Sequence, residues 1–209
     1  MDMKKRGDMQ FARISAEAAT EERARCREIL QELNFADQPD FCLFASLVKE
    51  LLGKSDGAYI HPPFYCDYGT HIEAGKNFYA DYNCAILDAA GVKIGDNCQL
   101  ASGVAICTVG HPIYPDTCKT AFEYGKEITI GDNVRIGQNT VVCPGVQIGD
   151  NVVIGAGSVV TKDIPSWTIA AGNPCRVIRK ITEADRRRLF HNEEIDDEAW
   201  NMICEREEK

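Results

Sequence analysis

The chain contains four histidines, and His111 is the one whose position most favours chemistry. It lies in a Gly-His-Pro stretch that interrupts an otherwise repetitive region. An imidazole titrates near pH ~6.5, so it can take up and return a proton at neutral pH. His191 lies in a polar tail, and His61 and His71 flank a Pro-Pro pair, where a histidine is more often structural. His111 is therefore the candidate general base.

Other catalytic chemistries have less support in the sequence. There is no G-x-S-x-G nucleophile elbow, and Ser158 is better explained as a residue of the repeat. Cys107 lies four residues before His111, which could pair a thiol with a base, but Cys107 also directly follows a repeat position. A zinc site needs several converging ligands, and only His111 lies in a loop of the repeat region. We therefore expect no metal requirement.

Basic residues cluster toward the C-terminal end of the repeat region: Lys162, Arg176, Arg179 and Lys180. Because the chain as a whole carries a formal net charge of −9, such a cluster could hold a phosphorylated ligand. Charges on an exposed end of the fold would give the same spacing. Both interpretations stay open on spacing alone.

These candidates lie in residues 54–180, where a six-residue repeat sets the structure. An aliphatic residue recurs every six positions, at Ile130, Ile136, Val142, Ile148, Ile154 and Val160. Glycine follows most of these positions, and Gly-Asp-Asn recurs in one phase of the repeat. The period suits short strands joined by tight turns, where Gly and Asn accept a positive φ. Stacked coils of this kind bury a continuous core, so the repeat predicts a parallel β-helix.

The six-residue repeat is interrupted between Cys84 and Ile94, and the sequence between Ile106 and Ile130 is typical of a loop. We place an excursion loop at 107–127, and it contains His111. Loops that break out of a solenoid are where function concentrates.

The two ends of the chain read as helical. Residues 1–53 are assigned to a helical hairpin cap, with the connection at Asn34–Gln38 and the second helix beginning near Pro39. Residues 181–209 form an acidic tail, and a helix is predicted to begin at Thr182. The fold class is therefore an all-β solenoid with an N-terminal helical cap and a C-terminal helix.

Composition limits the class of function. The 209 residues are 44% hydrophobic, and the net negative charge argues against nucleic acid and anionic membranes as partners. We expect neither a signal peptide nor a membrane span. Ten cysteines occur without a C-x-x-C pair, so reduced thiols in a cytoplasmic protein are the expected state.

Several motifs together resemble the maltose/galactoside O-acetyltransferase family. They are the segments 77–84, 110–112, 123–126, 154–165 and 171–180. The resemblance runs from the helical hairpin to about Ile181. It implies a left-handed parallel β-helix, a homotrimer with active sites at subunit interfaces, and acetyl-CoA as the donor substrate. The handedness comes from the resemblance alone, because the period does not set it.

The resemblance also implies residue roles. His111 would take the proton of an acceptor hydroxyl as that oxygen attacks the thioester. The implied acceptor-site residues are Tyr79, Asp81, Asn83, Asp88, Glu123 and Arg23, completed by a neighbouring subunit. The implied CoA-contacting residues are Gln138, Ala156, Thr161, Lys162, Arg176 and Arg179, with the backbone N–H of Gln138 as an oxyanion donor.

Four positions depart from the family pattern. Asp81 stands where the galactoside enzyme has asparagine, Ala89 replaces an aspartate, and Arg135 replaces a tryptophan. The N-terminal aspartate expected to bind sugar aligns near Arg13 or Ile14. These changes predict an altered acceptor preference.

The leading hypothesis is an acetyl-CoA-dependent O-acetyltransferase that acts on a small hydroxylated acceptor, a sugar. A serine- or antibiotic-type hexapeptide acetyltransferase is an alternative within the same class, and a panel of acceptors separates the two. A non-catalytic β-helical scaffold is the alternative from another class, and failure to bind CoA would favour it.

Overall fold

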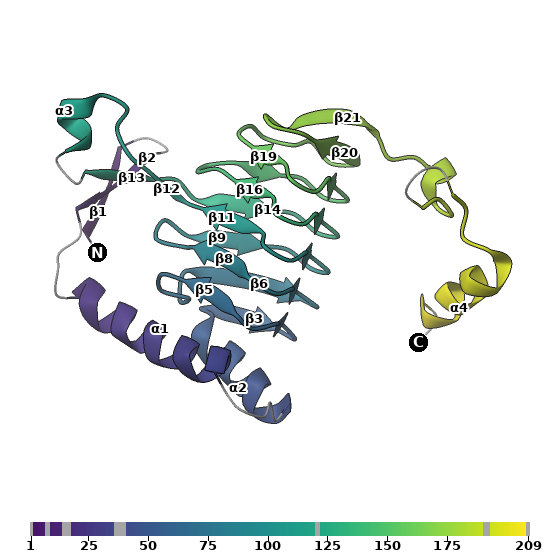
Figure 1. Ribbon diagram of the computed structural model, residues 1–209, viewed down its shortest axis with the longest axis horizontal. Coiled ribbons are helices and arrows are strands. Elements are labelled where there is room, and N and C mark those ends of the chain that lie inside the picture. Colours follow the sequence, from purple (N-terminus) through teal and green to yellow (C-terminus); the bar gives the residue numbers. More distant parts are fainter. Residues whose placement is uncertain are drawn as a thin grey trace.

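The computed structural model describes residues 2–6, 9–13, 18–35, 41–119, 122–189 and 193–207. Most of them wind into a β-solenoid with helices at one end and an extended tail at the other (Figure 1). Each turn of the solenoid contributes one short strand to each of three parallel sheets, which we call the first, second and third faces.

The strands alternate in chain order among the three faces. The first face contains β3 (Lys54–Asp56), β6 (Ile72–Lys76), β9 (Val92–Ile94), β14 (Ile128–Ile130) and β17 (Gln147–Ile148). The second face contains β4 (Tyr59–Ile60), β7 (Tyr79–Ala80), β10 (Gln99–Leu100), β15 (Arg135–Ile136), β18 (Val153–Ile154), β20 (Thr168–Ala171) and the antiparallel β21 (Arg176–Lys180). The third face contains β5 (Phe64–Cys66), β8 (Cys84–Leu87), β11 (Ala105–Cys107), β16 (Val141–Val142) and β19 (Val159–Val160).

The aliphatic residue of each hexapeptide points into the solenoid, as the repeat predicts. All six residues of the series are buried: Ile130, Ile136, Val142, Ile148, Ile154 and Val160. Full burial of such a side chain stabilises the fold by about 1.5–3 kcal/mol. The prediction of a β-solenoid is therefore confirmed.

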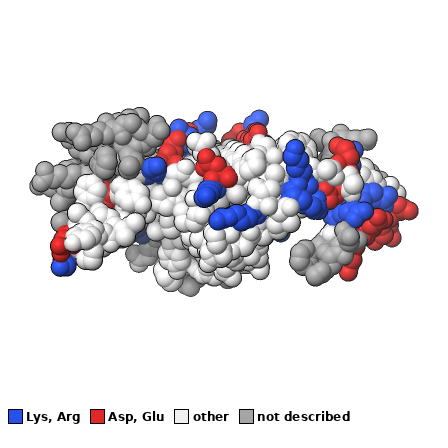
Figure 2. All heavy atoms as spheres, turned by 90° about the horizontal axis from the view of Figure 1, so that it is seen from above, with Lys and Arg blue, Asp and Glu red and all other residues white. Residues whose placement is uncertain are grey.

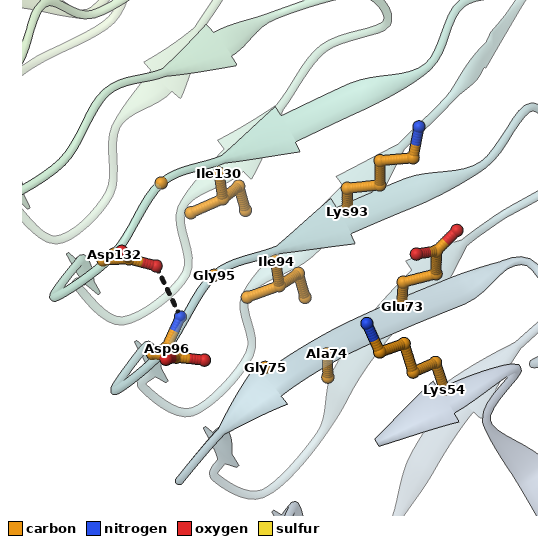
Figure 3. A pocket seen from close by; sticks show the side chains of 11 residues that line it. Lys54, Glu73, Ala74, Gly75, Lys93, Ile94, Gly95, Asp96, Ile130 and Asp132 are labelled. Atoms are coloured by element: carbon orange, nitrogen blue, oxygen red, sulfur yellow. Dashed lines mark hydrogen bonds between the residues drawn. The ribbon is translucent and has the colours of Figure 1, made fainter. Parts of the chain in front are cut away.

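The recurring Gly-Asp-Asn tripeptide builds the corner that follows the first face. The Asp132 carboxylate accepts the backbone N–H of Asp96 at 2.7 Å, one coil away (Figure 3). A Cβ at Gly95 would lie 2.7 Å from the carbonyl carbon of Gly131, which only glycine avoids. Asn133 supplies the turn, with φ at 55°. Each residue of the Gly-Asp-Asn tripeptide thus has its own structural role in the corner.

Two helices close the end of the solenoid, α1 (Ala18–Phe35) and α2 (Phe41–Leu51). Their buried residues recur at helical spacing and join the solenoid core, as Leu30 and Leu33 do in α1. The predicted helical hairpin is present, but α1 continues through Asn34, which the sequence analysis had placed in the connection. The predicted helix start at Pro39 lies outside the described residues.

A four-stranded sheet stands beside the solenoid and was not predicted. It contains β1 (Asp2–Arg6), β2 (Met9–Arg13), β13 (Glu123–Gly125) and β12 (Val109–Gly110). Assigning all of residues 1–53 to a helical cap was therefore wrong for residues 2–6 and 9–13. The missed signal is long-range, because β2 pairs with β13 of the excursion loop. That loop also contains the short helix α3 (Pro115–Cys118).

The C-terminal tail leaves the last coil and extends away from the solenoid (Figure 1). The predicted helix start at Thr182 is a capping box that begins only a 3-10 turn, η1 (Glu183–Asp185). The α-helix of the tail, α4, comes later, at Asp197–Glu207. Among the helices of the described segments, none combines the length and the apolar character that a membrane span requires.

Candidate active site

His111 and Glu123 face each other at the base of the excursion loop. The antiparallel register of β12 and β13 pairs Gly110 with Tyr124, which places residue 111 opposite residue 123. The result is a contact of 3.3 Å between His111 Nε2 and Glu123 Oε1. The His111 side chain is 55% exposed and the Glu123 side chain 32%, so solvent and small molecules reach both. A carboxylate at one ring nitrogen orients an imidazole for proton transfer at the other.

A buried polar cluster lies beside this pair, where α1 meets the solenoid. Asp88 is fully buried, and its Oδ1 accepts the backbone N–H groups of Asp67 and Tyr68, each at 3.0 Å. The Arg23 guanidinium lies 4.9 Å from the centroid of the Tyr68 ring. Asp88 Oδ2, Tyr68 Oη and Arg23 Nε are buried without a hydrogen-bond partner. Unpaired buried polar atoms are costly, so this cluster is suited to receive the polar groups of a ligand.

Asp67 is a candidate site residue that the sequence analysis missed. Burial raises the pKa of its carboxyl group, the Arg23 charge lowers it, and the charges of Asp88 and Glu123 raise it further. Asp67 therefore lies within electrostatic reach of the carboxylate that contacts His111. The position of Asp67 in the repeat could have identified it. Because β5 pairs with β8, Asp67 and Asp88 lie at the same corner of successive coils.

Asp81 and Tyr79 form a second group, at the end of β7. The Asp81 carboxylate accepts hydrogen bonds from Ser102 Oγ at 2.7 Å and from the Tyr82 N–H at 2.8 Å. These donors, Ser102 first, lower the pKa of Asp81, so this carboxylate stays ionised. The Tyr79 ring stacks on Tyr59, with centroids 6.0 Å apart. Asn83, the third predicted residue in this segment, has a φ of 60° and forms the turn into β8.

Backbone hydrogen bonds stack these turns into one corner, which we call the leading edge of the third face: residues 81–83, 101–103, 137–139 and 155–157. Gly103 N–H donates to Tyr82 O at 2.9 Å, and Gly157 N–H donates to Gln138 O at 2.7 Å. Gln138 and Ala156, two of the predicted CoA-contacting residues, thus share this edge with Asp81.

A second set of predicted residues lies on the opposite side of the same face. We call this corner the trailing edge: residues 67–68, 88–90, 108–111, 143–145 and 161–163. Asp67, Asp88 and His111 lie here, and so do Thr161 and Lys162, which directly follow β19. Arg176 and Arg179 lie on β21 of the second face, where they pair with Ala171 and Ile169. Within one chain, the candidates on the coils therefore divide between the two edges of the third face.

The predicted basic cluster lies at the end of the solenoid from which the tail departs. Figure 2 shows Lys and Arg side chains gathered there, beside acidic side chains of the tail. The two terminal nitrogens of the Arg179 guanidinium, Nη1 and Nη2, donate to the Asp185 carboxylate at 2.8 Å. This fork lowers the pKa of Asp185 to about 2. The tail thus supplies an anionic partner to a cation predicted to bind phosphate.

The first face carries a hollow of ≈ 380 Å³ (Figure 3), but its chemistry does not suggest a site. Its carboxylates Asp96 and Asp132 accept backbone N–H groups of neighbouring coils. Within the described residues, no group of three or more His, Cys, Asp or Glu side chains is arranged to hold a metal ion.

Comparisons with known proteins agree with this architecture. Residues 127–162 match the family model described as bacterial transferase hexapeptide (six repeats), and residues 82–107 match hexapeptide repeat of succinyl-transferase. A putative acetyltransferase of Saccharomyces cerevisiae is 52% identical over 157 residues, which cover 75% of this chain and 80% of that protein. The galactoside O-acetyltransferase of Escherichia coli is 42% identical over 181 residues, 86% of this chain and 89% of that protein.

Solved structures of acetyltransferases are also similar to this chain. A galactoside acetyltransferase in complex with coenzyme A superimposes with a TM-score of 0.85 and 40% identity, covering 90% of this chain and 94% of that one. A maltose O-acetyltransferase from Clostridium difficile superimposes with a TM-score of 0.80 and 42% identity, covering 83% and 93%.

Proposed function

The chain belongs to the galactoside/maltose O-acetyltransferase family of hexapeptide-repeat acetyltransferases and is an acetyl-CoA-dependent O-acetyltransferase, and we propose that it acetylates a hydroxyl of a sugar with His111 as general base. The observation that carries this proposal is the His111–Glu123 contact at the base of the excursion loop. Both side chains are exposed enough to meet two substrates.

His111 accepts the proton of the acceptor hydroxyl as the oxygen attacks the acetyl carbonyl carbon. When bound, acetyl-CoA supplies that acetyl group as a thioester. The Glu123 carboxylate stabilises the imidazolium that His111 becomes, and His111 then returns the proton to the leaving sulfur. General-base assistance of this kind is worth about 10²–10⁴-fold in rate. The acetyl group passes directly from donor to acceptor while both are bound.

The chain has residues of the right types to hold the donor. Lys162 at the end of the third face and Arg176 and Arg179 of β21 are exposed, so they provide positive charge suited to the phosphates of CoA. Thr161 and Ala156 would contact the donor on either side of that face. The backbone N–H of Gln138 would stabilise the negative charge that develops on the carbonyl oxygen.

The division of the site between two edges supports an oligomer. In this proposal the leading edge of one subunit meets the trailing edge of the next, which brings Asp81 toward His111. Contact between unlike edges gives a ring where the rotation between subunits closes, and the ring proposed here is a homotrimer. The outward residues of the third face fit such an interface, since they are largely small and uncharged: Tyr65, Ala85, Ala105, Val141 and Val159. The outward residues of the first face, by contrast, include Glu73 and Lys93.

The acceptor site would consist of Arg23, Asp67 and Asp88 on the trailing edge, with Tyr79, Asp81 and Asn83 from the neighbouring subunit. Their carboxylates accept hydrogen bonds from hydroxyl groups, which favours a polyhydroxylated acceptor. Ten cysteines without a C-x-x-C pair fit reduced thiols, and we infer a cytoplasmic location from that pattern.

A panel of acceptors tests the sugar assignment. Purified protein is incubated with acetyl-CoA and one acceptor at a time, and release of the CoA thiol is measured. We expect turnover with galactosides, maltose or glucose and little with serine or aminoglycosides. Preferential acetylation of serine or of an antibiotic would contradict the sugar assignment, and no binding of CoA would contradict the enzymatic one.

A further inference from the structure

We propose that Cys26 of α1 and Cys66 of β5 form a reversible intrachain disulfide that fastens the helical cap to the first coil of the solenoid. The two Sγ atoms lie 3.5 Å apart. Cys26 Sγ also lies 3.7 Å from the carbonyl oxygen of Cys66. Cys26 is fully buried and Cys66 is half-buried, so Cys66 is the more accessible residue of the pair.

The packing of α1 holds the two sulfurs together. The Asn34 side-chain amide exchanges two hydrogen bonds with the backbone of Phe64, each of 2.9 Å, as a neighbouring strand would. Cys26 shares its helix face with Leu30 and Leu33, all of them buried. A disulfide has an S–S length of about 2.05 Å, so the sulfurs must approach by roughly 1.5 Å. The cap must therefore shift slightly when the bond forms.

Thiol–disulfide exchange with a small disulfide, such as oxidised glutathione, supplies the oxidation. The Cys66 thiolate attacks one glutathione sulfur and expels the other glutathione as a thiol. The Cys26 thiolate then attacks the Cys66 sulfur, forms the protein disulfide and expels the second glutathione. Each protein thiol loses one proton, and the two electrons end on the glutathione pair. The Cys26 sulfur and burial raise the pKa of the Cys66 thiol, so its thiolate is scarce and the first exchange is the slow step.

The pair adjoins the acceptor side of the site. Arg23 lies one helical turn before Cys26, and Asp67 directly follows Cys66. Movement of the cap therefore displaces Arg23 relative to Asp67. This consequence rests on the proposed function. Because a displacement of about 1 Å can lower activity about 10²-fold, we expect oxidation to raise the acceptor KM at least tenfold and to leave the acetyl-CoA KM unchanged.

Oxidation of the full chain, followed by peptide mapping, tests the bond. Folded protein is incubated with oxidised glutathione, remaining thiols are alkylated, and peptides are identified with and without dithiothreitol. We expect a linked Cys26–Cys66 peptide in the wild type and in Cys118→Ser, a control that removes an exposed thiol. Cys26→Ser should instead retain glutathione on Cys66. Alkylation of both Cys26 and Cys66 after oxidation of folded protein would overturn the disulfide.

Kinetics of the same samples test the consequence. An acceptor KM that rises on oxidation of the wild type, returns with dithiothreitol and stays constant in Cys66→Ser, which can form neither the disulfide nor a mixed disulfide at position 66, supports the coupling. An unchanged acceptor KM in fully oxidised protein overturns it. If no acceptor is acetylated at all, the proposed function fails, whereas the peptide map still decides whether the bond forms.

Discussion

Glu123 Oε1 lies 3.3 Å from His111 Nε2, across a hairpin that the excursion loop makes outside the solenoid. The register of β12 and β13 fixes this pairing, so the solenoid itself does not have to position the base. Each residue of the pair has a distinct expected role: His111 moves the proton, and Glu123 orients and stabilises the protonated ring.

Glu123→Gln is expected to lower kcat by about tenfold or more with little change in the acetyl-CoA KM, since the amide cannot stabilise an imidazolium. Steady-state kinetics of CoA release measure the effect. Glu127→Gln is the matched control, because Glu127 pairs with Lys93 at 3.1 Å on the first face. Equal losses in both variants would contradict a specific role for Glu123.

Arg179 and Asp185 form one ion pair, but their replacement should change donor binding in opposite directions. Arg179→Ala removes a phosphate-binding cation and is expected to raise the acetyl-CoA KM by about tenfold. Asp185→Ala releases the Arg179 guanidinium from its fork and should lower that KM. Isothermal titration with CoA provides an independent measurement. A fall in affinity in both variants would show that the pair serves structure only.

The same carboxylate predicts a dependence of stability on acid. The pKa of Asp185 is lowered to about 2 in the folded chain, against about 3.9 in an unfolded one. Its contribution to stability is therefore present above about pH 4 and is lost as the pH falls toward about 2. Asp185→Asn should remove this part of the acid sensitivity in thermal melts between those values. An unchanged profile would contradict the prediction.

Ser102→Ala should move the acid limit of acceptor binding to higher pH. Ser102 Oγ donates to Asp81 and is the main cause of its lowered pKa. A carboxylate with a lowered pKa binds as an anion until the pH falls through that pKa, so loss of the donor shifts this transition upward. The acceptor KM measured against pH reports the shift. A profile identical to that of the wild type would contradict a role for ionised Asp81.

The core of the solenoid was predictable from the sequence, whereas the sheet beside it was not. The inward series from Ile130 to Val160 was predictable because every hexapeptide repeats the same burial and the same turn. The strands β1 and β2 were not: they pair with each other locally, but β2 is anchored by β13, which lies more than a hundred residues later. The handedness of the coil is likewise absent from a period of six.

The site was predictable where a residue acts alone and less so where neighbours decide its role. His111 was singled out by its place in the loop, and its role as the base stays a prediction. Asp88, predicted as an acceptor ligand, uses one oxygen to hold the backbone of Asp67 and Tyr68; its contact with the acceptor stays a prediction. The Arg179 fork depends on a tail carboxylate that no repeat pattern relates to it.

Gly95→Ala should destabilise the solenoid by about 1–3 kcal/mol, because the new Cβ would overlap the backbone of the next coil. Gly157→Ala is the comparison: its φ is +68°, but nothing lies within 4 Å of the added atom. Strain alone should cost about 1 kcal/mol there. Urea unfolding of both variants measures the difference, and a Gly157→Ala loss equal to or larger than that of Gly95→Ala would contradict the close-packing argument.

A charge on the third face should prevent assembly. Ala105→Glu places a carboxylate among the small outward residues of that face, whereas Thr129→Glu places one on the polar first face. We expect Ala105→Glu to sediment as a monomer with little activity and Thr129→Glu to behave as the wild type. An active Ala105→Glu monomer would show that one chain holds a complete site.

The central claim is that His111 is the general base, and His111→Asn tests it most directly. Asparagine retains polarity and size but cannot accept the proton at neutral pH. We predict that kcat falls by about 10²-fold or more, while the sedimentation coefficient and the affinity for CoA stay as in the wild type. Turnover of His111→Asn within about threefold of the wild type would contradict the account.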